Sequence, residues 1–95
     1  MANFVLICID KPDSLALRMA TREAHFAYAR SKAPMVKLGG PFLDDKGDMA
    51  GSLIILEAED MAAARRFNTE DPYTLAGLFE SVDVRPWRAT FGAIA

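Results

Sequence analysis

The sequence has one cysteine, one histidine and no long apolar run, and each scarcity argues against a class of protein. A single thiol, Cys8, cannot form an internal disulfide, so the chain is not a disulfide-stapled scaffold. One histidine and dispersed carboxylates make a weak set of metal ligands. No apolar segment approaches the roughly 20 residues that a membrane-spanning helix needs. We therefore expect neither a metal site nor an integral membrane protein.

Targeting and nucleotide-binding motifs are missing as well. The first nine residues carry no basic segment, and Asp10 and Lys11 end the first apolar stretch early, which does not fit a signal peptide. We therefore expect a cytoplasmic protein. The sequence contains no phosphate-binding glycine loop, dinucleotide fingerprint or serine nucleophile elbow. We expect no cofactor.

The composition is typical of a small globular domain. Of its 95 residues, 52% are hydrophobic and 25% are charged, which excludes a disordered chain and predicts one domain over residues 1–95. The net charge is −2 and the basic residues are scattered, whereas nucleic-acid binding needs a concentrated positive field. We therefore expect neither nucleic acid nor a membrane as a partner. A domain this small has a thin stability margin, which dimerisation commonly increases.

Apolar and helix-favouring segments alternate in an order that predicts the fold. The expected elements are a strand over residues 3–9, a helix over 15–30, strands over 35–38 and 49–57, a helix over 61–67, a helical turn over 73–77 and a last strand over 78–87. The order β-α-β-β-α-β matches the α+β ferredoxin-like fold, an antiparallel sheet with both helices on one face. Its other face would stay exposed in a monomer, so we expect a homodimer.

Several local signals refine this outline. Cys8 lies in an apolar run and is predicted to be a buried strand residue rather than a catalytic thiol. Asp13 or Ser14 is expected to cap the first helix, and Asp60 the second. Residues 44–48 predict a hairpin turn, and Pro86 favours an edge strand. The expected core face of the first helix consists of Leu17, Ala20, Ala24, Ala27 and Tyr28.

The candidate chemistry centres on His25, within the predicted first helix. Arg22 precedes it by three residues and Arg18 by seven, which places all three on one stripe of the helix. Arginine binds carboxylates through a planar set of donors. Histidine changes its charge most readily near neutral pH. The stripe fits an anion-binding site beside a titratable group, and it equally fits an ordinary solvated helix face.

Three further features add candidates. Asp71 precedes Pro72, which is common at a helix end, but a carboxylate can also hold His25 in one tautomer and make it a better general base. The glycines of segment 39–41 permit close approach of a ligand or accommodate bends in a twisted sheet. Ser52 can donate a hydrogen bond into a pocket.

Together these segments resemble the YciI-like (YCII-related) family. The resemblance is carried by Asp13–Ser14–Leu15 with Arg18, Arg22 and His25, by Gly39–Gly40–Pro41, by Gly51–Ser52, by Asp71–Pro72–Tyr73 with Ala76–Gly77–Leu78–Phe79, and by Val84–Arg85–Pro86–Trp87. It covers nearly the whole chain, although the loop over residues 44–48 is shorter than in some relatives. It implies a ferredoxin-like fold assembled as a dimeric α/β barrel.

The resemblance also implies an active site and a kind of reaction. By position it assigns catalytic roles to His25 and Asp71 and substrate-binding roles to Arg18, Arg22 and Ser52, to which we add Gly40 and Tyr73. Dehydrochlorination is attributed within the family, and the wider fold group includes muconolactone isomerases and cofactor-free oxygenases. We therefore expect proton transfer by His25, in isomerisation or elimination, on a small anionic organic molecule. The alternatives are a non-catalytic ligand-binding dimer, an interaction module and a cofactor-free oxygenase.

Overall fold

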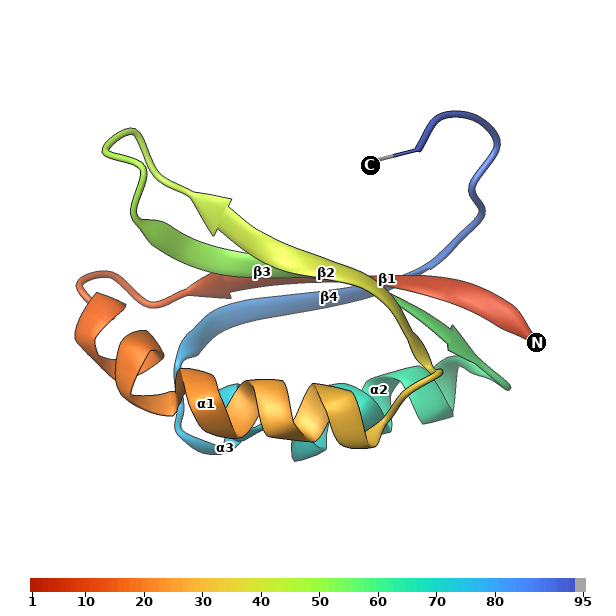
Figure 1. Ribbon diagram of the computed structural model, residues 1–95, viewed down its shortest axis with the longest axis horizontal. Helices are drawn as coiled ribbons and strands as arrows, with labels where there is room; N and C mark the ends of the chain where they lie inside the picture. Colours follow the sequence, from red (N-terminus) through yellow and green to blue (C-terminus); the bar gives the residue numbers. More distant parts are fainter. Residues whose placement is uncertain (94–95) are drawn as a thin grey trace.

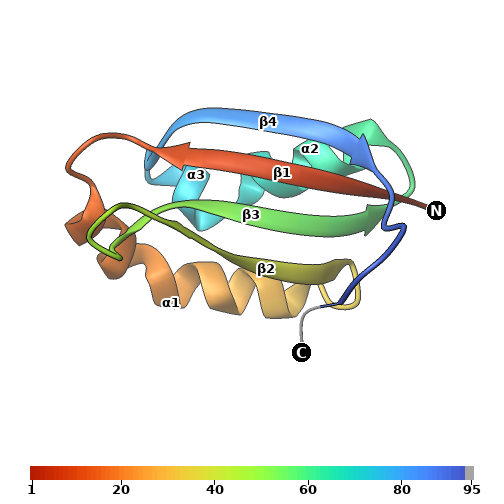
Figure 2. The ribbon, with the colours of Figure 1, turned by 90° about the horizontal axis from the view of Figure 1, so that it is seen from above.

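Four strands form one antiparallel sheet, and the helices lie on one of its faces. The computed structural model describes residues 1–93. Its elements are β1 (Ala2–Asp10), α1 (Leu15–Ser31), β2 (Val36–Leu43), β3 (Met49–Ala58), α2 (Met61–Glu70), α3 (Pro72–Leu75) and β4 (Phe79–Trp87) (Figure 1). The strand order is β2-β3-β1-β4 (Figure 2). The predicted ferredoxin-like topology is confirmed.

The core lies between the central strands, β1 and β3, and the helices. Leu6 and Leu56 point toward the helices and are fully buried, and Phe67 of α2 packs in the same cluster. Because successive side chains of a strand alternate between its faces, Val5 and Ile55 point to the opposite side. No helix covers that side of the sheet (Figure 1).

Cys8 is buried in this core, as its place in an apolar strand predicts. Its Sγ lies 3.9 Å from the Oδ1 of Asn68. Burial, with a smaller contribution from the charge of Asp71, raises the pKa of the thiol to about 12. The thiolate is the nucleophilic form of cysteine. Cys8 therefore stays protonated at neutral pH, and its role is structural.

The two long helices begin differently. At the start of α2 the Asp60 carboxylate accepts a hydrogen bond from the Ala63 backbone N–H at 2.8 Å, so the predicted cap is confirmed. Ser14 occupies the N-cap position of α1 without capping it, because its hydroxyl donates to the Pro12 carbonyl at 3.2 Å. Asp13 adopts a φ of 57° in the turn before it. The expected side-chain cap of α1 is wrong, since the turn engages the hydroxyl.

The expected core face of α1 is also wrong. Leu17 is 38% exposed, the three alanines of that face are exposed, and only Tyr28 is partly buried. The buried residues of α1 are Arg18 and His25 instead. Both stripes have helical spacing, so periodicity alone could not distinguish them. The polar stripe turns inward because its side chains find polar partners on β1, β3 and the α2–α3 junction.

Two elements are longer than predicted. The strand expected over residues 35–38 continues through Gly39, Gly40 and Pro41 to Leu43, because these residues pair with β3, and the helix expected over 61–67 continues to Glu70. β2 and β3 pair as the expected hairpin, and Asp44 holds its turn by accepting hydrogen bonds from the N–H groups of Lys46 and Asp48. β4 is an edge strand, a position that tolerates Pro86. No helix within residues 1–93 is long and apolar enough to cross a membrane.

Candidate active site

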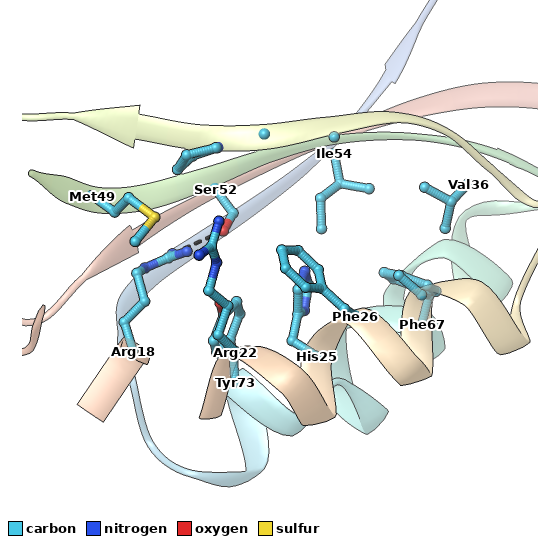
Figure 3. Close-up of a pocket in the computed structure, with 14 residues that line it drawn as sticks. Arg18, Arg22, His25, Phe26, Val36, Met49, Ser52, Ile54, Phe67 and Tyr73 are labelled. Atoms are coloured by element: carbon cyan, nitrogen blue, oxygen red, sulfur yellow. Dashed lines mark hydrogen bonds between the residues drawn. The ribbon is translucent and has the colours of Figure 1, made fainter. Parts of the chain in front are cut away.

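A cavity of about 290 Å³ opens between α1 and the β2–β3 hairpin (Figure 3). Space remains there because β2 contributes Gly39 and Gly40, while α1 contributes polar side chains instead of large aliphatic ones. Of the predicted site residues, all except Asp71 line the cavity: Arg18, Arg22, His25, Gly40, Ser52 and Tyr73. Apolar side chains close the rest of it, namely Phe26, Val36, Pro41, Met49, Ile54 and Phe67.

The structure brings His25 and Asp71 together from distant parts of the chain. The His25 Nδ1 lies 2.9 Å from Asp71 Oδ1 and 3.1 Å from Oδ2, and Asp71 is 1% exposed. Asp71 Oδ1 also accepts the Tyr73 backbone N–H at 2.9 Å, at the start of α3. Asp71 is therefore both the helix cap and the histidine partner.

This geometry selects one tautomer of His25. Because an ionised carboxylate only accepts hydrogen bonds, Nδ1 carries the proton, and Nε2 of the neutral ring is left as the acceptor. Nε2 makes no hydrogen bond to any residue that the structure describes, and His25 forms part of the cavity wall. The arrangement leaves a free acceptor nitrogen beside the cavity, as a general base requires.

The Tyr73 ring packs against the imidazole of His25. Its ring stacks on that of His25 with centroids 4.2 Å apart and an interplanar angle of 17°. The Arg18 Cζ lies 4.5 Å from the Tyr73 ring centroid, and Figure 3 shows Tyr73 between Arg18 and His25. Burial raises the pKa of the Tyr73 phenol above its ordinary value, although the charges of Arg18 and Arg22 oppose this shift. The phenol is therefore neutral at physiological pH.

The two arginines of the stripe have different surroundings. Arg18 is 3% exposed, and it donates from Nε to Asp10 Oδ2 at 2.7 Å and from Nη2 to Asp10 Oδ1 at 3.0 Å. Nη2 also donates to the Ser52 Oγ at 2.8 Å, the dashed line in Figure 3. Burial lowers the pKa of Arg18, but the hydrogen bonds and charge of Asp10, together with a contribution from Tyr73, outweigh burial and raise the pKa overall.

Arg22 has no such carboxylate. It forms no ion pair with residues 1–93, and its Cζ lies 5.0 Å from the Phe26 ring centroid. It lines the cavity one turn after Arg18. Of the two arginines, Arg22 is the one whose charge is available to a ligand.

Sequence comparison places the chain among known proteins. The profile of the YCII-related domain matches residues 2–88. The chain belongs to the YCII-related family. Protein YciI from Escherichia coli O6:H1 is 32% identical to this YCII-related protein over 93% of this chain and 98% of its own length.

Two solved structures extend the comparison. The 5-chloro-2-hydroxyhydroquinone dehydrochlorinase TftG of Burkholderia phenoliruptrix AC1100 is 35% identical to this YCII-related protein. The match has a TM-score of 0.85, covers 93% of this chain and 95% of TftG, and the TftG structure holds 2,5-dihydroxybenzoquinone. An antibiotic biosynthesis monooxygenase is 18% identical, with a TM-score of 0.58 over 95% of this chain and 99% of its own, and shares the fold.

Sequence reasoning missed one polar residue of this YCII-related site. The sequence predicts only that Asp10 ends the first strand, whereas in the structure Asp10 is buried and accepts hydrogen bonds from Arg18. A signal was present, because Phe4, Leu6, Cys8 and Asp10 alternate on the helix-facing side of β1. The apolar walls, such as Ile54 and Phe67, had no signal, since a cavity wall and a core position need the same residue types.

Proposed function

We propose that this YCII-related protein is a cofactor-independent enzyme that transfers a proton on a small anionic organic molecule. His25 is the general base or acid, and Asp71 is a positioning residue that fixes its tautomer. The observation that carries the proposal is the orientation of His25, with Nδ1 on Asp71 and Nε2 left free beside the cavity. A positioned acid–base group contributes about 10²–10⁴-fold to a rate.

The supported reactions are isomerisation and elimination, including dehydrochlorination. In an elimination, Nε2 of His25 takes a proton from the substrate, the electron pair of that bond forms a new double bond, and chloride leaves with its own electron pair. Arg22 holds the negative charge of the substrate. The 35% identity to TftG, a dehydrochlorinase, supports elimination in particular. The wall of the cavity is largely apolar, and charge interactions beside such a surface are stronger than in bulk water.

Chloride release from 5-chloro-2-hydroxyhydroquinone is the first assay, with solvent deuterium exchange into enolisable acids as the second. We expect His25→Gln to lower the rate of the active assay by about 10²–10⁴-fold. Arg30→Gln is the control, because Arg30 is exposed on α1 and does not line the cavity. Equal rates in wild type and His25→Gln would contradict the mechanism. Binding without turnover in either protein would favour the ligand-binding dimer.

Asp71→Asn tests the positioning role with a readout separate from activity. In wild type, the ¹⁵N spectrum of the neutral His25 ring should show a protonated Nδ1 and an unprotonated Nε2. An asparagine amide can donate to Nδ1 and so favours the opposite tautomer, which also removes the free base. Identical ring ¹⁵N shifts in both proteins would show that Asp71 does not set the tautomer.

We further propose that the protein is a homodimer that buries the uncovered face of the sheet. The pairing of β1, β3 and β2 places one apolar set on that face: Val5, Ile7, Ile9, Leu53, Ile55, Leu38 and Phe42. Ile9 and Leu38 are exposed, and Trp87 of β4 is exposed on the same face. Arg85 and Asp83 of β4 make the edge of this face polar beside Val5 and Ile7, but the exposed apolar side chains on the other strands favour a protein–protein interface. A second copy is the occupant, since two such faces are complementary in character.

A further inference from the structure

Of the two arginines that line the cavity, Arg18 is paired with a carboxylate of the described residues and Arg22 is not. Arg18 and Asp10 form a buried two-bond ion pair, and both residues are under a tenth exposed. His25 and Asp71 form a second pair, which carries the negative charge of Asp71 when the imidazole is neutral, as the proposed base requires. Arg22 is the second arginine of the cavity wall, and within residues 1–93 no carboxylate pairs with it.

The positive charge of Arg18 is neutralised by Asp10, and the fold holds this pair in place. Its guanidinium is held at Nε and Nη2 by Asp10 and again at Nη2 by Ser52 Oγ, and its Cζ lies 4.5 Å from the Tyr73 ring centroid. A planar bidentate pair of this kind has defined geometry and strong hydrogen bonds. Recruiting Arg18 to a ligand would break bonds to a buried carboxylate, which is costly. Arg18 therefore contributes shape and hydrogen-bond donors to the wall, but little net charge.

We propose that Asp10 determines the charge of the ligand. By neutralising Arg18, it leaves Arg22 as the one uncompensated cation of the cavity, so that the site selects an organic acid with a single negative charge over a matched acid with two. This inference rests on the cavity being the ligand site of the proposed function, and it names the substrate class: small, largely apolar monoanions.

The physical basis is the cost of an unpaired charge in an apolar cavity. A monoanion that reaches Arg22 leaves the arginine and ligand charges balanced. The second charge of a dianion would lie among side chains such as Phe26, Ile54 and Phe67 with no cation to meet it. Such a charge loses its hydration without compensation. The preference for a monoanion over a dianion therefore depends on how many arginines of the wall lack a carboxylate partner. Among the residues described, Asp10 pairs with Arg18 and leaves Arg22 alone in this respect.

Two probes of the same shape test this directly. 4-Carbamoylbenzoate and terephthalate differ only in that a neutral amide replaces one carboxylate. Their dissociation constants follow from the shifts of the single His25 ring signal at neutral pH. We expect wild type to bind 4-carbamoylbenzoate about tenfold more tightly than terephthalate. Equal or reversed affinity in wild type, or no shift with either probe, would overturn the proposal.

Asp10→Asn is the decisive variant, because it frees the charge of Arg18 while keeping the shape of the side chain. We expect it to move the ratio of the two dissociation constants about tenfold toward terephthalate. An unchanged ratio in a folded Asp10→Asn protein would overturn the proposal. Circular dichroism establishes that the variant is folded.

Arg22→Gln keeps the test decisive if Asp10→Asn does not fold, since it leaves the buried ion pair intact. We expect it to weaken binding of 4-carbamoylbenzoate about tenfold, whereas Arg30→Gln, with the same change in net charge outside the cavity, leaves the affinity unchanged. Unchanged affinity in Arg22→Gln would overturn the proposal.

The readout separates this inference from the proposed function. Charge preference is measured by binding and does not need turnover. A preserved preference with rates unaffected by His25→Gln would contradict proton transfer and leave the charge selection standing. Turnover that depends on His25, with no preference for the monoanion, would support proton transfer and contradict the charge selection.

Discussion

The single carboxylate of Asp71 has two hydrogen-bond partners, the Tyr73 backbone and the His25 ring. One of its oxygens accepts the Tyr73 backbone N–H that begins α3, and both oxygens lie within 3.1 Å of His25 Nδ1. An Asp before a proline is common at helix ends, so the local pattern by itself predicts the cap. The pairing with His25 is a hypothesis that the sequence offers and the family resemblance implies, and the packing of α3 against α1 brings the two side chains into contact.

Glycines offer the sharpest stability prediction at the residue scale. A Cβ built on Gly51 would lie 2.5 Å from the Cys8 carbonyl oxygen, a backbone atom of the neighbouring strand that cannot move aside alone. We expect Gly51→Ala to lower the free energy of unfolding by about 1–3 kcal/mol, as overpacking commonly does. Urea denaturation followed by circular dichroism measures the change.

Gly40→Ala is the matched control for this prediction. A Cβ on Gly40 meets nothing within 4 Å, so we expect the free energy of unfolding to change by less than about 1 kcal/mol. Equal destabilisation by the two substitutions would show that the contact with the Cys8 carbonyl is not the cause.

The helix caps give the corresponding prediction at the scale of elements. The Asp60 carboxylate satisfies the Ala63 N–H at the start of α2, so Asp60→Ala should lower the free energy of unfolding by about 0.5–2 kcal/mol. Ser14→Ala, at the equivalent position of α1, should change it by less than about 0.5 kcal/mol, because Ser14 caps no helix N–H. Chemical denaturation of both variants decides the matter, and a larger loss from Ser14→Ala would contradict the assignment of the caps.

Element type and order could be predicted from the sequence, whereas the orientation of α1 could not. Strands β1 and β3 are apolar runs bounded by turn residues, and such signals are local. The inward face of α1 depends on partners far along the chain: Asp10 for Arg18, and Asp71 for His25. A helix with polar and small apolar stripes at the same spacing has two plausible faces. Long-range contacts of Arg18 and His25 decide which face of α1 points inward, whereas hydrophobic periodicity favours the face that is exposed in the structure.

In the whole molecule, the sheet separates the cavity from the uncovered apolar face. The helices and the cavity lie on one side, and the uncovered apolar face lies on the other (Figure 1). The cavity exists because α1 stands over β2 and β3 with polar side chains between them, and its walls need no residue from the uncovered face. The proposed dimer would therefore increase stability without filling the cavity from the sheet side.

Size-exclusion chromatography with light scattering tests that dimer. Wild type should have twice the mass of the chain, and Ile55→Glu should have the mass of one, because a carboxylate at the centre of the apolar face would be buried without a partner. Ile55 lies between Val5 and Leu38 in the sheet, so the substitution places no like charge directly opposite. Leu75→Glu is the control, since Leu75 is 73% exposed on α3 and lies off the uncovered face of the sheet. A wild-type protein with the mass of one chain, or an Ile55→Glu protein with that of two, would show that this face is not the interface.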